Sequence, residues 1–184
     1  STINNGQTLS LTAGAAAVTV TGATGGTTAL TSFTASGNTI AVNNVRTTST
    51  QSYTGAASTT FNGTSYLTAG GTFGVTGPAL LGAGATIDTT NSGGTPAGAS
   101  ISFSTTINNA QTLSLVGGTA GAITVSGIVG GTTPLTSFTA NANTISTVGV
   151  RTTGLQSYTA PTSSTFNGTY TTTVGAGGTF TVTG

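Results

Sequence analysis

The chemistry open to this chain is set by three charged side chains, Arg46, Arg151 and Asp88. Histidine and cysteine are absent, and the two arginines account for every basic residue. A single carboxylate without a partner base lacks the parts for paired-carboxylate, triad or metal-assisted catalysis. The sequence therefore predicts no catalytic residue, no metal site and no cofactor, and it predicts that the protein is not an enzyme.

Four side chains are candidates for surface contact. Arg46 and Arg151 each follow a valine, and a guanidinium at such a place could hold a carboxylate of a ligand or of a neighbouring fibre. The favoured interpretation of both arginines is a solvated group, or one that donates to nearby backbone carbonyls at a coil edge. Tyr53 and Tyr158 are the tyrosines that we expect at the surface.

The near absence of charge restricts the partners. The net charge is +1, with 2% charged residues in 184. Two arginines do not make a phosphate-binding surface, so no nucleic-acid partner is expected. A net charge this small also removes the repulsion that keeps soluble proteins apart, which favours self-association, lateral or end to end. No apolar run is long enough for a membrane-spanning helix.

A tandem repeat organises these residues. GGTTALTSFTASGNTI at Gly25–Ile40 recurs as GGTTPLTSFTANANTI at Gly130–Ile145. Arg46 maps to Arg151, 105 positions later, and the TINN segment near the start recurs after 104. The sequence predicts a first superrepeat over residues 1–104 and a second, incomplete one over 105–184, without a linker between them.

Short stretches of alternating polar and apolar residues fill each unit. Examples are Leu9–Leu11, Val18–Val20 and Ile123–Val125, bounded by Gly, Asn or Pro. This pattern, rich in β-branched residues, predicts short strands with one buried face. With 30 glycines, abundant threonine and no apolar stripe at helical spacing, the chain is expected to be all-β.

Two architectures fit many short strands. The favoured one is a parallel β-helix, or β-solenoid, of roughly 20-residue coils. It would have about five coils per superrepeat and about nine in all. The alternative is a string of antiparallel β-sandwich domains. Alternation places the repeated phenylalanines inward, where they are expected to stack in the core: Phe33, Phe138, Phe61, Phe166, Phe73 and Phe180.

Two further motifs have competing interpretations. Asn62-Gly63-Thr64 and Asn167-Gly168-Thr169 match the N-glycosylation pattern, but an Asn-Gly corner between strands is the favoured explanation. Thr-x-Thr at Thr19–Thr21 and Thr181–Thr183 resembles the outward threonine arrays of ice-binding solenoids.

The phrases GGTTALTSFTA, VRTTSTQSYTG, ATIDTTNSGG and ASISFSTTINNAQTLSL resemble the β-strand-repeat regions of large bacterial secreted proteins. These regions are similar to filamentous haemagglutinin and autotransporter passenger domains. The resemblance implies export to the cell surface, a right-handed parallel β-helix, and a role in adhesion, biofilm or fibre structure. It carries over no catalytic residue.

The leading hypothesis is a structural, extracellular β-solenoid that builds a surface filament, sheath or biofilm matrix. The runner-up is the stalk of a secreted adhesin whose glycan-binding regions lie outside this segment, with surface polysaccharide as the partner. Ice binding is the third alternative.

Overall fold

The computed structural model describes residues 2–172 and 178–184, which form eighteen strands. In chain order they are β1 (Leu9–Thr12), β2 (Ala17–Val20), β3 (Phe33–Val42), β4 (Val45–Arg46), β5 (Gln51–Phe61), β6 (Ser65–Leu67), β7 (Phe73–Thr76), β8 (Ala79–Leu81), β9 (Ala85–Asp88), β10 (Ile101–Phe103), β11 (Ile107–Asn108), β12 (Thr112–Val125), β13 (Ser137–Thr147), β14 (Val150–Thr152), β15 (Gln156–Thr159), β16 (Ser163–Phe166), β17 (Tyr170–Thr172) and β18 (Phe180–Thr183).

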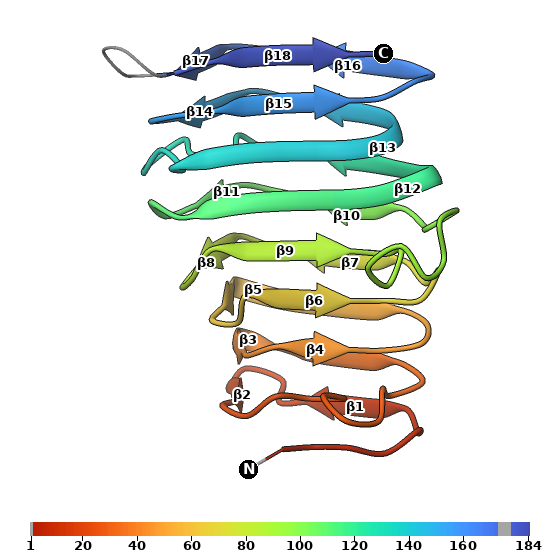
Figure 1. The fold of residues 1–184 in the computed structure, drawn as a ribbon. Coiled ribbons are helices and arrows are strands. Elements are labelled where there is room, and N and C mark those ends of the chain that lie inside the picture. Colours follow the sequence, from red (N-terminus) through yellow and green to blue (C-terminus); the bar gives the residue numbers. More distant parts are fainter. Residues whose placement is uncertain (1, 173–177) are drawn as a thin grey trace.

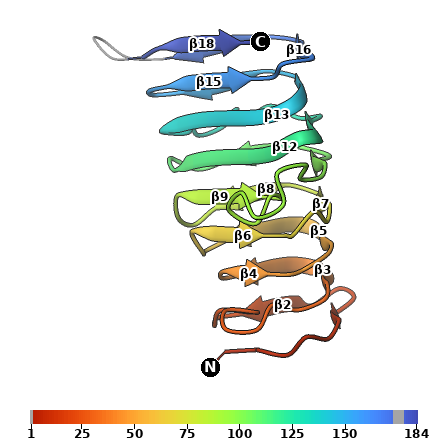
Figure 2. The same ribbon diagram turned by 45° about the vertical axis from the view of Figure 1, so that its right-hand side comes forward.

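The strands wind into a β-solenoid of about 8 turns, with parallel strands stacked about 22 residues apart (Figures 1 and 2). Every ladder between two of these strands is parallel. The predicted solenoid is thereby confirmed, and the antiparallel sandwich alternative is wrong. The expectation of nine coils was slightly high because glycine-rich loops lengthen several turns.

Each turn has three sides, which form three faces of a prism. Face A stacks β1, the first halves of β3 and β5, β7, β10, the second halves of β12 and β13, and β16. Face B stacks β2, the second halves of β3 and β5, β8, β11, Val129, β14 and β17. Face C stacks β4, β6, β9, the first halves of β12 and β13, β15 and β18.

Alternation along the strands sends one row of side chains into the prism. In β7 the pattern is buried Phe73, half-buried Gly74, buried Val75 and exposed Thr76, as a two-residue period requires. The interior is narrow, so aromatic rings from different faces of one turn meet. The ring of Tyr53 lies 5.3 Å from that of Phe61, and Phe61 lies 5.0 Å from Tyr66.

The predicted phenylalanine core is confirmed in part. Phe33, Phe61, Phe73 and Phe138 are fully buried. Phe166 is only partly buried, and Phe180 is 48% exposed, although its ring packs against those of Tyr158 and Phe166. Phe180 lies in β18, which pairs with β15 on one side, and its ring centre is 5.4 Å from that of Tyr158.

The superrepeat does not span a whole number of turns. From Phe33, four turns lead up face A to Ile123, and two further sides, through Val129 on face B, lead to Phe138 on face C. Repeat-related residues therefore lie four and two-thirds turns apart rather than five. Each motif of the first unit reappears on a different face in the second.

Glycine shapes the repeated corner at the start of the GGTT block. Gly25 and Gly130 have φ of 73° and 70°, a region that favours glycine. A Cβ at either position would collide with the backbone oxygen of Arg46 or Arg151, one turn on. That oxygen accepts the amide hydrogen of Leu30 or Leu135, which keeps the corner closed.

The Asn-Gly dipeptides lie at corners as well. Asn62 follows β5, is exposed, and donates its backbone amide to the oxygen of Val42 at 2.8 Å. Asn167 follows β16 in the same way and donates to Thr147 at 2.9 Å. The predicted Asn-Gly corners are confirmed, and glycosylation at Asn62 and Asn167 stays a prediction.

Candidate interaction surface

The two tyrosines expected at the surface are inside the prism. Tyr53 and Tyr158 are both 0% exposed, so the prediction of surface contact for them is wrong. Burial raises the pKa of each phenol well above its ordinary value, because the phenolate would lose its hydration. The neighbouring tyrosine rings, Tyr66 and Tyr170, raise it further.

A buried glutamine explains why a tyrosine hydroxyl is tolerated there. Tyr53 donates to Oε1 of Gln51 at 2.9 Å. Nε2 of Gln51 in turn donates to the backbone oxygens of Val45 at 3.1 Å and Leu67 at 2.8 Å. The polar groups satisfy one another, so their burial carries little penalty.

The second unit repeats this network. Tyr158 donates to Gln156 at 3.1 Å, and Nε2 of Gln156 donates to the oxygens of Val150 and Thr171. Gln51 and Gln156 were missed as structural residues. The available signal was the Gln-x-Tyr spacing, since residues two apart in a strand face the same side.

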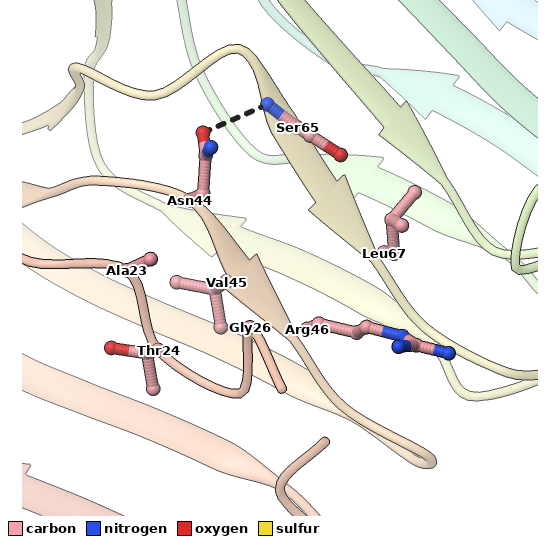
Figure 3. Close-up of a pocket in the computed structure, with 8 residues that line it drawn as sticks. All are labelled: Ala23, Thr24, Gly26, Asn44, Val45, Arg46, Ser65 and Leu67. Atoms are coloured by element: carbon pink, nitrogen blue, oxygen red, sulfur yellow. Dashed lines mark hydrogen bonds between the residues drawn. The ribbon is translucent and has the colours of Figure 1, made fainter. Parts of the chain in front are cut away.

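Arg46 borders a shallow hollow on face C (Figure 3). The hollow has a volume of about 190 Å³ and is lined by Thr24, Val45 and Leu67, among others. Asn44 closes one edge by accepting the backbone amide of Ser65 at 3.1 Å. With one guanidinium and small apolar walls, the hollow could hold a single carboxylate on a small group.

Arg151 has a different environment from its repeat partner. Its Nη1 donates to the backbone oxygen of Gly131 at 2.7 Å, which is the carbonyl-bonded alternative considered for it. It lies on face B, whereas Arg46 lies on face C. The structure therefore does not bring the two arginines together, and each retains only an individual capacity for surface contact.

Asp88 organises a loop. Its carboxylate accepts the backbone amide and hydroxyl of Thr90, both at 2.6 Å, and the amide of Ser92 at 2.9 Å. These bonds fix the start of the loop between β9 and β10, in which Asn91 and Ser92 adopt positive φ. Within residues 2–172 and 178–184, no cluster of three or more His, Cys, Asp or Glu side chains could hold a metal ion.

Face A presents the most regular surface of the molecule. Its central outward row runs up all eight turns in unbroken register, and seven of its eight residues carry a hydroxyl. The row is Ser10, Thr34, Ser52, Gly74, Ser102, Thr124, Ser146 and Thr165. A parallel row two residues further along the strands begins with Thr12, Ser36, Thr54 and Thr76.

The hydroxyls of this central row are available to a partner. All seven belong to side chains that are exposed or half-buried, and none makes a hydrogen bond within the described chain. No charged residue lies on face A, since Arg46 and Asp88 belong to face C and Arg151 to face B. The rows stack about 4.8 Å apart. We refer to this surface, defined by the central row, as the hydroxyl face.

Sequence reasoning missed the hydroxyl face. The Thr-x-Thr motifs that it singled out are divided between face B, where Thr19 lies, and face C, where Thr181 and Thr183 lie. Alternation predicts the outward direction of the serines and threonines in this row, but it does not hold for every such residue, since Thr59, Thr147 and Thr152 are buried. Which of them stack on one another depends on turn lengths, and these vary.

Comparison with known proteins gave no match: no family model, no curated protein and no solved structure is similar to this chain. None of the described residues belongs to a helix that could cross a membrane.

Proposed function

We propose that this chain is a structural, non-enzymatic segment of an extracellular β-solenoid that builds a surface filament, sheath or matrix by lateral association of identical segments. The observation that carries the proposal is the hydroxyl face, which is continuous and uncharged along the whole solenoid. The extracellular location and the adhesin-stalk alternative rest on the sequence resemblance alone.

A second copy of the chain is the partner that fits this face. Two copies have the same row spacing because their chains are identical, so the hydroxyls of one copy can stay in register with those of the other over every turn. Each hydroxyl both donates and accepts a hydrogen bond. Since the face holds no charge, pairing buries no ion and avoids the desolvation cost that buried charges impose.

The expected contact is modest in size. Eight rows about 4.8 Å apart and strands of about five residues give roughly 550 Å² per partner, or about 1,100 Å² in total. Stable interfaces bury about 1,200–2,000 Å². A single segment should thus associate weakly, whereas several segments in one fibre would reinforce one another through multivalency.

Two glutamates on the hydroxyl face should prevent this association. In the double variant Thr34→Glu, Ser102→Glu, pairing would bury carboxylates on a face that offers no cation to pair with them, which costs several kcal/mol. We expect the dissociation constant measured by sedimentation to rise by about 100-fold or more. The control, Thr19→Glu with Thr60→Glu on face B, makes the same change in net charge and should associate like the parent chain.

The outcome is decisive for the proposal. A parent chain that stays monomeric at millimolar concentration would contradict it. Equal association by the two glutamate variants would show that the hydroxyl face is not the contact.

Ice binding is a second candidate because the hydroxyl face is a rigid array with two regular spacings, about 4.8 Å between turns and about 6.6 Å along a strand. Such an array could order water into a lattice. If it does, the parent chain should lower the freezing point of water below its melting point, and Thr34→Glu, Ser102→Glu should abolish the effect. A parent chain without activity in this assay rules the candidate out.

A further inference from the structure

The repeat geometry creates a second hydroxyl row on another face. Because the superrepeat spans four and two-thirds turns, the strand that carries Thr34 on face A in the first unit carries Thr139 on face C in the second. In the same way, Ser52 on face A corresponds to Ser157 on face C. The surface that we assign to self-association is thus copied onto a face one third of a turn away.

The second row runs through the upper turns of face C in unbroken register. It consists of Thr86, Ser114, Thr139, Ser157 and Thr181. All five carry a hydroxyl, and none of these hydroxyls makes a hydrogen bond within the described chain. One turn lower Ser65 continues the register, but it lines the hollow that Arg46 borders, and its backbone amide donates to Asn44, so Thr86 is the last residue of the open row.

We infer that this row, which we call the second hydroxyl face, is a further contact for another copy of the chain, so that one segment joins two neighbours at an angle. The inference rests on the proposed function of the first hydroxyl face. The argument for a second copy is continuity of sequence and geometry, since the two surfaces share repeated strands and the same row spacing. Asp88, the one acidic residue on face C, is 7% exposed and bonded to Thr90 and Ser92.

The sizes of the two faces set an order of assembly. Five rows about 4.8 Å apart give roughly 300 Å² per partner, or about 600 Å² in total. This is below the size of specific stable interfaces, so the second face alone should not hold two free segments together. It should act only between segments that the first face has already paired, where the local concentration is high. Pairs therefore form first, and sheets or bundles form from pairs.

The test compares three double variants of the whole chain by sedimentation and electron microscopy. They are Ser157→Glu with Thr181→Glu on the second face, Thr34→Glu with Ser102→Glu on the first, and the face B control Thr19→Glu with Thr60→Glu. We expect the parent and the control to form assemblies larger than dimers at high concentration. The second-face variant should stop at dimers, and the first-face variant should lose association about 100-fold at every step.

The results separate the two proposals. If the second-face variant assembles beyond dimers like the parent chain, or if the parent itself stops at dimers, the second contact is wrong while the first stands. If the parent is monomeric, the proposed function fails as well. Circular dichroism checks that each variant is folded, and Ser114→Glu with Thr139→Glu provides an independent second-face pair.

Discussion

Replacing Phe73 with alanine is expected to lower the free energy of unfolding by about 3–5 kcal/mol, the range found for buried aromatic residues. Phe73 is fully buried on face A. Its ring centre lies 5.4 Å from that of Tyr53, 5.9 Å from Phe61 and 6.0 Å from Phe103. It therefore links three successive turns of the interior.

The cavity left by this change should persist. The strand that carries Phe73 is hydrogen-bonded to β5 on one side and β10 on the other. These ladders fix the spacing of the turns, so the neighbouring rings cannot close the gap without breaking backbone bonds. Since a domain has only about 5–15 kcal/mol of stability in total, the loss would be a large part of it.

The repeat supplies a matched control in Phe180. It is the counterpart of Phe73 in the second unit, but it lies on the last turn and is 48% exposed. Phe180→Ala should cost about 1 kcal/mol, because half of the ring is already in water. Denaturant unfolding followed by circular dichroism measures both. Equal losses would contradict full burial of Phe73 beside a half-exposed Phe180.

The contrast between these residues shows what the sequence could and could not predict. Alternation predicts an inward Phe73 and an inward Phe180, and both do face the interior. It does not indicate which turn lies at an end of the stack. Phe73 is buried because the next turn covers it, and the position of that turn is fixed by the pairing of β10 with β7, which are far apart in the sequence.

Tyr53 illustrates a different limit. Its position two residues after Gln51 places both side chains on one side of the strand. A polar pair of this kind suggests the surface, and only the carbonyls of Val45 and Leu67 make its burial favourable. Those carbonyls belong to two other strands, so the sequence around Gln51 does not predict that Gln51 and Tyr53 are buried.

The hydroxyl face could likewise be predicted only from the pairing of strands that lie far apart in the sequence. Serine and threonine occur on most strands, and alternation along the strand predicts which of them point outward. Their alignment into one row requires the register of successive turns, such as Thr34 beside Ser52 and Ser102 beside Thr124. Loops of unequal length, for example residues 89–100, make that register unpredictable from spacing.

Raising the pH above about 10 is expected to unfold the protein, because all four tyrosines have raised pKa values. Burial is the main cause for each of them: Tyr53, Tyr66, Tyr158 and Tyr170. An unfolded chain releases its phenolic protons near pH 10, whereas the folded chain retains them to higher pH. The stabilisation is thus complete below pH 10 and is lost progressively above it.

The magnitude follows from proton linkage. Each fully buried tyrosine removes about 1.4 kcal/mol per pH unit above 10 until its own folded pKa is reached. Tyr53, Tyr66 and Tyr158 are fully buried, so together they remove about 4 kcal/mol per unit. Against a stability of about 5–15 kcal/mol, unfolding should occur within a few pH units of 10.

Two signals recorded on one sample provide the measurement. Tyrosinate absorbance and the circular dichroism of the β-sheet should change together in a single transition displaced above pH 10. The chain in denaturant serves as the control and should titrate near 10. If most of the tyrosinate signal appeared near pH 10 with the sheet intact, the phenols would not be buried in hydrogen-bonded sites. A single joint transition would instead show that ionisation of Tyr53 and Tyr158 sets the highest pH at which the protein stays folded. Their hydroxyls donate to Gln51 and Gln156, and an ionised phenol cannot donate.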